Sequence, residues 1–381
     1  MQNTIYEYEE IKEENNRELK THIIDNSSLH QYFKLDWKTL KAKQYCGILN
    51  FNNQDFYILP KIANRNDEKN INIFIYMLMY AYDVKLSNEQ IASCANQEYT
   101  ILEVFVQMFA NGLLQELKKG LYKEYLTKQD NLPVLKGKYL INENLKYNFT
   151  KNKIYCEYDE FSSNNSLNQF FLYSVKYLQK FVNDKKLLKQ CELIFDEVED
   201  KSVDINKLEM VHFNRLNSRF KTSFEIAILL LKQSIPLFSQ DKKSFAFLFD
   251  MNVLFEKFIA RMVKELDNNG KIQNQDDFED LTLKPDIILK NQIIDTKYKK
   301  LNSLNDIKQG DKLQAFSYGI NYKIENVMLL YPKHLDNINY DLVLGEERIV
   351  NLKIRTIDLN FSGNNYKEYI DEIRERVEIV L

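Results

Sequence analysis

The sequence is poor in the residues that build linkers and in the patterns that build common metal centres. Nine glycines and five prolines among 381 residues form no Gly/Ser/Pro-rich linker. The four cysteines lie far apart with no CxxC pair, which predicts reduced thiols rather than disulfides or a structural zinc site. They are Cys46, Cys94, Cys156 and Cys191. The four histidines are scattered without ligand spacing, which disfavours a histidine-based hydrolase. If the chain is an enzyme, carboxylates and lysines must carry its chemistry.

Several other signals are absent. No GxxxxGK[ST], GxGxxG, HExxH or GxSxG motif occurs, so we expect no nucleotide hydrolysis by the chain itself. The longest apolar run, 226–231, is too short to span a membrane. The acidic first residues contain no apolar stretch and predict no signal peptide, so we expect a cytoplasmic protein that does not enter a membrane. With 52 basic and 55 acidic residues the net charge is -3, so any nucleic-acid contact must be local.

Apolar residues are abundant enough for two domains. The first part reads as β-rich, with strands at 45–50 and 55–59 joined at Asn52-Asn53 and ended by Pro60. Helical periodicity follows, and the C-terminal part alternates helices with strands. We predict a mixed α/β (α+β) fold with domains 1–155 and 156–381. The expected helices are 71–82, 101–119, 166–191, 216–233, 251–266, 308–318 and 366–377, and the expected strands of the second domain are 283–289, 292–298 and 327–331.

Residues 115–153 are locally basic. Nine lysines against four acidic residues give a net charge of +5, and four tyrosines are interleaved. Such a segment can contact a phosphate backbone or an acidic partner. An ordinary solvated surface explains the same composition equally well.

The segment Lys284–Tyr298 carries the strongest chemical signal. If Lys290-Asn291 is a two-residue hairpin turn, Asp286 lies opposite Asp295, and Lys297 projects to the same face. Two adjacent carboxylates repel each other, and a Mg²⁺ ion removes that cost. A water with a lowered pKa could then hydrolyse a phosphodiester while Lys297 stabilises developing charge. Two surface carboxylates in an ion pair with a lysine would fit the bare pattern as well.

Two further side chains are candidates for the same site. Glu256, in the preceding helix, could supply a third carboxylate or could be a solvated helix charge. Gln309 and Gln314 fall in the helix after the hairpin, where a glutamine can face the site and bind a water or a phosphate. Gln314 has apolar neighbours and is the better candidate of the two.

At these residues the chain resembles the PD-(D/E)xK nuclease superfamily. Further segments occur in the order expected of the McrC family, the nuclease subunits of McrBC 5-methylcytosine-specific restriction systems. They are Cys46-Gly47-Ile48, Tyr57–Ile62, Leu135–Lys138, Tyr155–Ser162 (YCEYDEFS), Phe213–Asn217 and Phe255-Glu256. The resemblance covers most of the chain. One departure is Lys136-Gly137-Lys138, which stands where arginine is frequent and so keeps charge without bidentate geometry.

The resemblance implies a DNA endonuclease subunit that works with a McrB-type AAA+ GTPase hexamer. An N-terminal region would dock on this motor and stimulate GTP hydrolysis, the motor would recognise methylated DNA, and the C-terminal domain would cut it. Asp286, Asp295 and Lys297 take the catalytic positions and Glu256 matches the helix glutamate. Asp286, Asp295 and Glu256 would hold Mg²⁺, with Mn²⁺ as a possible substitute. Residues 115–153 would lie in or near the docking region.

Two alternatives stay open from the sequence. The chain could be a non-catalytic adaptor that docks on and stimulates an AAA+ motor. It could also be a nuclease that acts alone on RNA or branched DNA.

Overall fold

The chain folds into two compact units, one inserted into the other along the sequence. The computed structural model describes residues 4–11, 13–36, 39–51, 54–63, 66–83, 101–150, 152–202, 212–239, 242–333 and 337–381. Unit 1 comprises Met1–Ile101 and Pro236–Leu381, and unit 2 comprises Leu102–Ile235. This division differs from the domains 1–155 and 156–381 expected from the sequence. The reason is that β8 (Ile154–Ser162) pairs with β6 (Glu124–Leu132) along its whole length, so the chain on both sides of residue 155 forms one ribbon.

The first sheet of unit 1 has the strand order β1-β5-β4-β10-β9. The expected hairpin is present as β4 (Tyr45–Phe51) and β5 (Gln54–Leu59), and β5 ends before Pro60 as predicted. The turn residues Asn52-Asn53 lie outside the described residues. A Cβ at Gly47 would lie 2.1 Å from the Phe247 carbonyl oxygen, so only glycine lets the neighbouring strand approach. The remaining strands are β1 (Thr4–Tyr6), β9 (Ser234–Ser239) and β10 (Lys242–Asp250).

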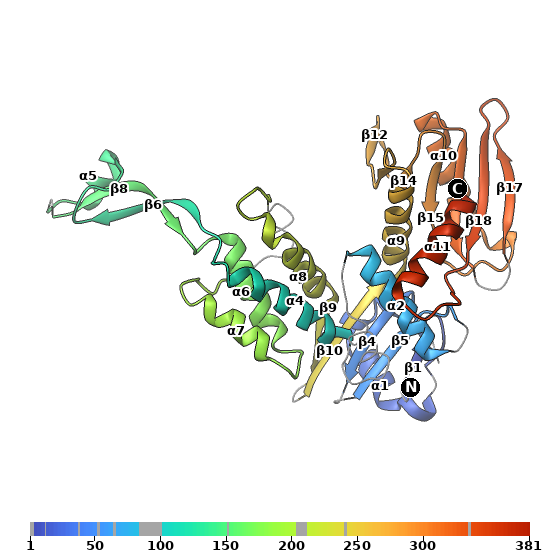
Figure 1. Ribbon diagram of the computed structural model, residues 1–381, viewed down its shortest axis with the longest axis horizontal. Helices are drawn as coiled ribbons and strands as arrows, with labels where there is room; N and C mark the ends of the chain where they lie inside the picture. Colours follow the sequence, from blue (N-terminus) through green and yellow to red (C-terminus); the bar gives the residue numbers. More distant parts are fainter. Residues whose placement is uncertain are drawn as a thin grey trace. The chain divides into compact units, whose positions relative to one another are not determined.

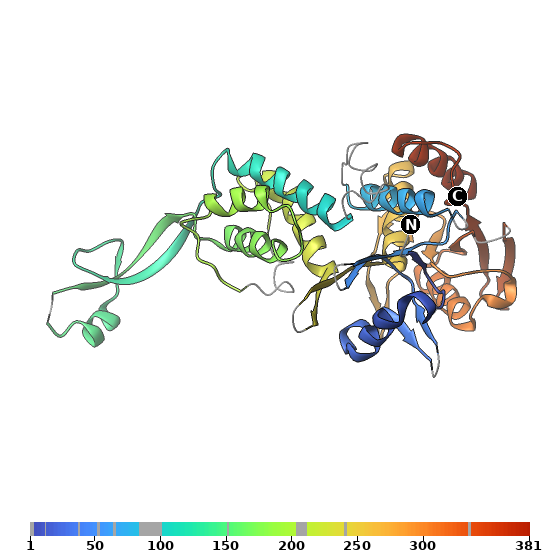
Figure 2. The same cartoon turned by 90° about the horizontal axis from the view of Figure 1, so that it is seen from below.

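Helices flank this sheet. Figure 2 shows α1 (Glu13–Asp25) and α2 (Asp67–Ala81) on opposite faces of it. Asn66 caps α2 by accepting a hydrogen bond from the Lys69 backbone N–H, and ten of the helix residues are buried. A small hairpin of β2 (Phe33–Leu35) and β3 (Leu40–Ala42) completes the N-terminal part of the unit. Of the four cysteines, Cys46, Cys156 and Cys191 are buried free thiols, and Cys94 lies outside the described residues.

The second sheet of unit 1 has the order β11-β14-β15-β16-β18-β17. Its centre is parallel, with β15 (Ile293–Thr296), β16 (Asn326–Pro332) and β18 (Val350–Ile357) side by side. The outer strands β11 (Lys271–Ile272), β14 (Ile287–Ile288) and β17 (Asn339–Leu344) run antiparallel to their neighbours. The observed architecture is therefore the mixed α/β fold that the sequence predicts. Strands β17 and β18 had no counterpart in the sequence interpretation.

Three helices pack on this second sheet (Figure 1). They are α9 (Met251–Leu266), α10 (Gln309–Tyr322) and α11 (Tyr366–Val380), and each coincides with an expected helix to within a few residues. Ala315 and Tyr318 of α10 join a buried cluster with Ile293, Leu329 and Leu352. The face of β15 that carries Ile293 therefore packs against α10. A short hairpin, β12 (Asp276–Phe278) with β13 (Leu281–Leu283), precedes β14.

Unit 2 is a helical body with a β-ribbon. Its helices are α4 (Ile101–Leu117), α6 (Ser166–Leu178), α7 (Lys186–Ile194) and α8 (Lys221–Gln233). The single helix expected over 166–191 is wrong, because the chain breaks between α6 and α7. There the Asn183 backbone N–H donates to Glu103 and the Asp184 side chain accepts from the Lys186 N–H. The first bond ties the break to α4, and the second, a local one, satisfies a backbone N–H at the start of α7.

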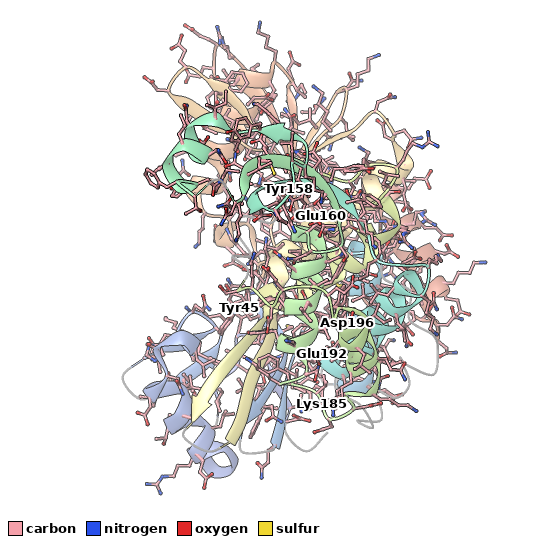
Figure 3. The ribbon with its side chains drawn as sticks, turned by 90° about the vertical axis from the view of Figure 1, so that its left-hand side faces the viewer. Tyr45, Tyr158, Glu160, Lys185, Glu192 and Asp196 are labelled. Atoms are coloured by element: carbon pink, nitrogen blue, oxygen red, sulfur yellow. The ribbon has the colours of Figure 1, made fainter. Side chains whose placement is uncertain are left out.

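The ribbon consists of β6, β8, the short β7 (Lys138–Tyr139) and the small helix α5 (Ile141–Tyr147), and it extends away from the helices of its unit (Figure 1). Figure 3 shows Tyr158 and Glu160 on β8. The Lys136 ammonium lies 3.9 Å from the centre of the Tyr158 ring, and the Tyr158 hydroxyl donates to Asp130 at 2.7 Å. Gly137 has φ +71°, and a Cβ there would lie 2.3 Å from the Glu157 carbonyl oxygen. The sequence Lys136-Gly137-Lys138 therefore needs its glycine for backbone reasons.

No helix among the described residues is both long and apolar enough to cross a bilayer.

Candidate active site

The hairpin at the centre of the site has the register that the sequence predicts. Ile287 pairs with Ile294 and Ile288 with Ile293, and the Leu289 N–H donates to the Gln292 carbonyl at 2.8 Å. The turn is therefore Lys290-Asn291. The paired strand β14 is only two residues long, much shorter than the expected 283–289. Pro285, which lacks an N–H, immediately precedes Asp286 and helps to limit the ladder.

Asp286 lies just before β14 and reaches the end of β15. Its Oδ2 accepts two hydrogen bonds from Thr296, one from the backbone N–H and one from the hydroxyl, both at 2.7 Å. The sequence predicts that Asp286 pairs with Asp295 across the hairpin. Instead, the Asp286 side chain binds Thr296, the residue after Asp295. The two carboxylates remain close enough for the charge of Asp286 to raise the pKa of Asp295.

Asp295 is buried at the centre of the cluster, with 2% of its surface exposed. Its Oδ2 lies 2.6 Å from the Lys297 ammonium. Burial, followed by the charge of Asp286, raises the pKa of Asp295 to about 7, although Lys297 opposes this. Because Ile293 packs toward α10, the alternation of a strand directs Asp295 and Lys297 to the same face.

Two side chains of α10 continue a chain of hydrogen bonds that begins at Lys297. The Lys297 ammonium donates to Gln314 Oε1 at 3.1 Å, and Gln314 Nε2 donates to the Tyr318 hydroxyl at 2.8 Å. Tyr318 in turn donates to the Lys284 carbonyl at 3.0 Å. Gln314 therefore lies beside Lys297. Gln309 is exposed and contacts none of these groups within the described part of the chain.

The pKa of Lys297 is raised. Burial lowers it, but the carboxylates of Asp295 and Asp286 outweigh that effect. The side chain is consequently an ammonium at neutral pH. It can donate hydrogen bonds and stabilise negative charge, and it is unsuited to act as a general base.

Glu256 projects from α9 toward Asp286. Burial and the charge of Asp286 raise the pKa of Glu256, while Gln273, Lys284 and Lys257 oppose the shift. The structure thus brings all five predicted residues into one cluster. They are Glu256, Asp286, Asp295, Lys297 and Gln314.

The sequence interpretation missed Gln273. Its side-chain amide donates to Glu256 Oε1 at 2.7 Å and its backbone N–H donates to the Asp286 carbonyl at 2.8 Å. It therefore contacts two of the clustered acidic residues at once. Its backbone is left-handed, with φ +49°, which is unfavourable for glutamine. Gln273 lies in an irregular segment, where no periodicity in the sequence could have identified it.

The donor set suits a hard divalent cation. Among the described residues, no group of three or more His, Cys, Asp or Glu side chains is already arranged to hold a metal ion. Glu256, Asp286 and Asp295 instead face Gln273, Thr296 and Lys297, respectively. Mg²⁺, however, commonly uses only one or two carboxylates and retains waters. Asp286 and Asp295 fit that requirement, because their mutual repulsion is what a cation would relieve.

Comparison with known proteins relates the chain to components of McrBC restriction systems. The family model described as "McrBC 5-methylcytosine restriction system component" matches residues 40–332. A chain in the refined half-complex from the tetradecameric assembly of Thermococcus gammatolerans McrB AAA+ hexamers with bound McrC is 23% identical, with 99% of both chains covered and a TM-score of 0.60. A chain in the cryo-EM structure of the Thermococcus gammatolerans McrBC complex is 26% identical, with 71% of this chain and 89% of that chain covered and a TM-score of 0.49. No curated protein matches the chain.

Proposed function

The chain belongs to the family of McrBC 5-methylcytosine restriction system components, and from this premise we propose that it is the metal-dependent DNA endonuclease subunit of a McrBC-like type IV restriction system. It would cut foreign, methylated DNA when driven by a McrB-type AAA+ GTPase hexamer that recognises the modified base. The observation that carries the proposal is the cluster of Glu256, Asp286, Asp295, Lys297 and Gln314 at one end of the second sheet. The α/β unit around it would be a PD-(D/E)xK nuclease fold.

The chemistry divides among the residues of the cluster. Asp286 and Asp295, with Glu256 after a small side-chain adjustment, would hold Mg²⁺ or, as a substitute, Mn²⁺. Such an ion lowers the pKa of water and neutralises charge on a phosphodiester. Lys297 would donate to the phosphate oxygen on which negative charge builds up. Gln314 and Tyr318 would fix the orientation of the Lys297 side chain, because Lys297 donates to Gln314 and Gln314 donates to Tyr318.

The ribbon of unit 2 is the part of the chain best suited to docking on the motor. Large apolar side chains are exposed along it, including Tyr125 (72% exposed), Leu145 (69%) and Phe149 (87%). Leu145 and Phe149 also line a cavity of about 550 Å³ together with Tyr139 and Lys153. Exposed apolar side chains rimmed by charge are typical of protein interfaces. The resemblance to the chain in the McrB–McrC assembly supports an AAA+ ring as the partner.

The test is reconstitution of DNA cleavage with the partner motor, GTP and Mg²⁺. We expect Asp286→Asn, Asp295→Asn and Lys297→Met each to lower the cleavage rate by roughly a hundredfold or more, because each removes a charge from the reacting centre. Stimulation of the motor's GTP hydrolysis should persist. Asp341→Asn is the matched control, since Asp341 is an exposed carboxylate on β17 that pairs with Arg355. Full cleavage by any of the three variants would contradict the assignment.

A non-catalytic adaptor is the second candidate, and the exposed ribbon favours it. An adaptor would stimulate the motor's GTP hydrolysis and never cut DNA at any Mg²⁺ concentration. The wild-type chain in the same assay, with and without a chelator, separates the two functions. Cleavage that requires the metal would exclude the adaptor function. Stimulated GTP hydrolysis without any cleavage of DNA would exclude the nuclease function.

A further inference from the structure

A groove lies beside Glu256 along α9. Its volume is about 280 Å³, and its floor is apolar, with Ala260 and Ile272 among the lining residues. Lys257, Arg261 and Lys264 line it from the helix, and Gln273 lines it next to Glu256. The groove is below the usual size of a pocket for a drug-sized ligand. It is suited to a small segment of an extended molecule.

Helical geometry explains why the three cations share this groove. Lys257, Arg261 and Lys264 are spaced by four and three residues, so their side chains follow one stripe of α9. Glu256 immediately precedes the first of them. A ligand that lies along the stripe therefore ends next to the carboxylate cluster.

The cations differ in what already holds them. The Arg261 guanidinium donates to the Tyr80 carbonyl at 2.6 Å and to Asp83 at 2.9 Å, and it also donates to Glu265 at 3.3 Å. Its charge is thereby compensated, and its role is structural. Lys264 is exposed and has no ion-pair partner among the described residues.

Lys257 completes the positive wall. Its ammonium lies 4.5 Å from the centre of the Tyr82 ring, and its side chain lines the groove. Glu265, the acidic lining residue, is bound by Arg261 and also by Arg374 at 2.8 Å. Lys264, which no acidic side chain pairs among the described residues, thus gives the groove a positive charge beside its apolar lining.

On the basis of the proposed function, we propose that this groove binds a DNA backbone phosphate next to the one being cleaved. Lys257 and Lys264 contact the phosphate, and the apolar floor accepts the neighbouring deoxyribose. Gln273 connects the groove to the reacting centre, since it borders the groove and donates to Glu256. The subsite would set where the strand lies, while the carboxylates perform the chemistry. It reads no base, because phosphate contacts carry no sequence information directly.

The test compares Lys264→Ala and the double variant Lys257→Ala/Lys264→Ala with the wild-type full chain. Binding of a fluorescein-labelled 40-base-pair duplex is followed by anisotropy in a chelator, and cleavage is followed in the complete system with motor, GTP and Mg²⁺. Each lost phosphate contact should weaken binding roughly five- to tenfold at about 0.1 M salt and reduce the slope of log K against log salt by about 1. KM for DNA should rise by a similar factor with kcat unchanged. Lys264→Arg should restore binding, and Lys367→Ala, an exposed lysine of α11, should have no effect.

The outcomes separate the two proposals. If the wild-type chain cuts DNA and both groove variants bind and cut it with unchanged KM and salt slope, the subsite is overturned. A loss of kcat at unchanged KM also overturns it, because the lysines would then belong to the reacting centre. If the wild-type chain cuts no DNA with motor and Mg²⁺ present, the proposed function itself fails, whatever the groove variants do.

Discussion

Each carboxylate of the cluster is held by a different donor. Asp286 is bound by Thr296, Asp295 by Lys297 and Glu256 by Gln273. This arrangement keeps three mutually repelling groups within reach of one another without a direct bond between any two of them. The cost appears in the raised pKa values of Asp295 and Glu256. A bound cation would relieve this cost, because it would attract the same carboxylates that repel one another.

Gln273 offers a test of how Glu256 is positioned. Gln273→Ala removes the hydrogen bond to Glu256 and keeps a left-handed residue, so it should destabilise the fold by about 1 kcal/mol. Gln273→Gly removes the same bond but relieves the left-handed backbone, worth roughly 1 kcal/mol, and its stability should stay near that of wild type. Both variants should slow cleavage roughly tenfold, as is usual when the partner of an active-site ligand is lost.

Urea unfolding and cleavage rates measured on the same preparations check this pair of effects. Gln275→Ala, an exposed glutamine two residues away, is the control. Unchanged cleavage by both Gln273 variants would mean that Glu256 needs no support from this side chain.

The relative positions of Asp295 and Lys297 could be predicted from the sequence, because they depend on the alternation of side chains along a strand. A two-residue turn fixes the register, and the register fixes the neighbours of Asp295 and Lys297. Thr296 could have been found, since it lies between them and its hydroxyl is a natural donor. Gln273 and Tyr318 could not, because their contacts depend on how a loop and α10 pack against the hairpin.

At the scale of elements, the ribbon was the least predictable part. Strand β6 has no buried residue and β8 buries only Cys156, so the alternation of apolar and polar residues that marks a half-buried strand is weak. The sequence interpretation assigned residues 115–153 a basic character and a place in or near the docking region, but no strands. The short β14 has a different cause: Pro285 has no N–H to donate, and the Asp286 side chain accepts the donors of Thr296.

A substitution at Gly137 tests how far the ribbon depends on the close approach of Gly137 to the Glu157 carbonyl. Gly137→Ala combines a left-handed backbone, which costs roughly 1–3 kcal/mol, with a Cβ placed 2.3 Å from the Glu157 carbonyl oxygen. We expect faster amide hydrogen exchange in β7 and β8 and weaker stimulation of the motor. Gly120→Ala is the matched control, because Gly120 has φ +107° but no atom within 4 Å of its Cβ position. Equal effects of the two substitutions would show that the contact with Glu157 is unimportant.

At the scale of the whole molecule, the division into units could not be read from composition. A domain inserted into another leaves no linker signal when both crossings run through regular elements, here α4 and β9. The expected boundary at 155 fell inside a strand for this reason. Unit 1 therefore joins the N-terminal sheet and the candidate active site, which the sequence interpretation had assigned to different domains.

A buried hydrogen bond connects these two parts of unit 1. The hydroxyl of Tyr298, the residue after Lys297, donates to Glu7 Oε1 at 2.7 Å across 291 positions of sequence. The Lys61 backbone N–H donates to the same oxygen at 3.1 Å. Burial raises the pKa of Glu7 to about 7, although Tyr298 and Lys61 oppose the shift. Glu7 is therefore a carboxyl whose titration reports on the contact between the first strand and Tyr298, the residue that follows Lys297.

This pKa predicts the direction in which stability changes with pH. Below the unfolded pKa of about 4.5 Glu7 is protonated in both states, and between that value and about 7 only the folded state retains the proton. The free energy of unfolding should therefore fall as pH rises from about 5 to 7, by roughly 2–3 kcal/mol from this group, and then level off. Glu7→Gln can still accept from Tyr298 but cannot titrate, so its stability should change less over this range. Urea unfolding at pH 5, 6, 7 and 8 compares the two proteins. A wild-type chain whose stability is flat or rises over this interval, with Glu7→Gln parallel to it, would show that Glu7 does not couple folding to protonation.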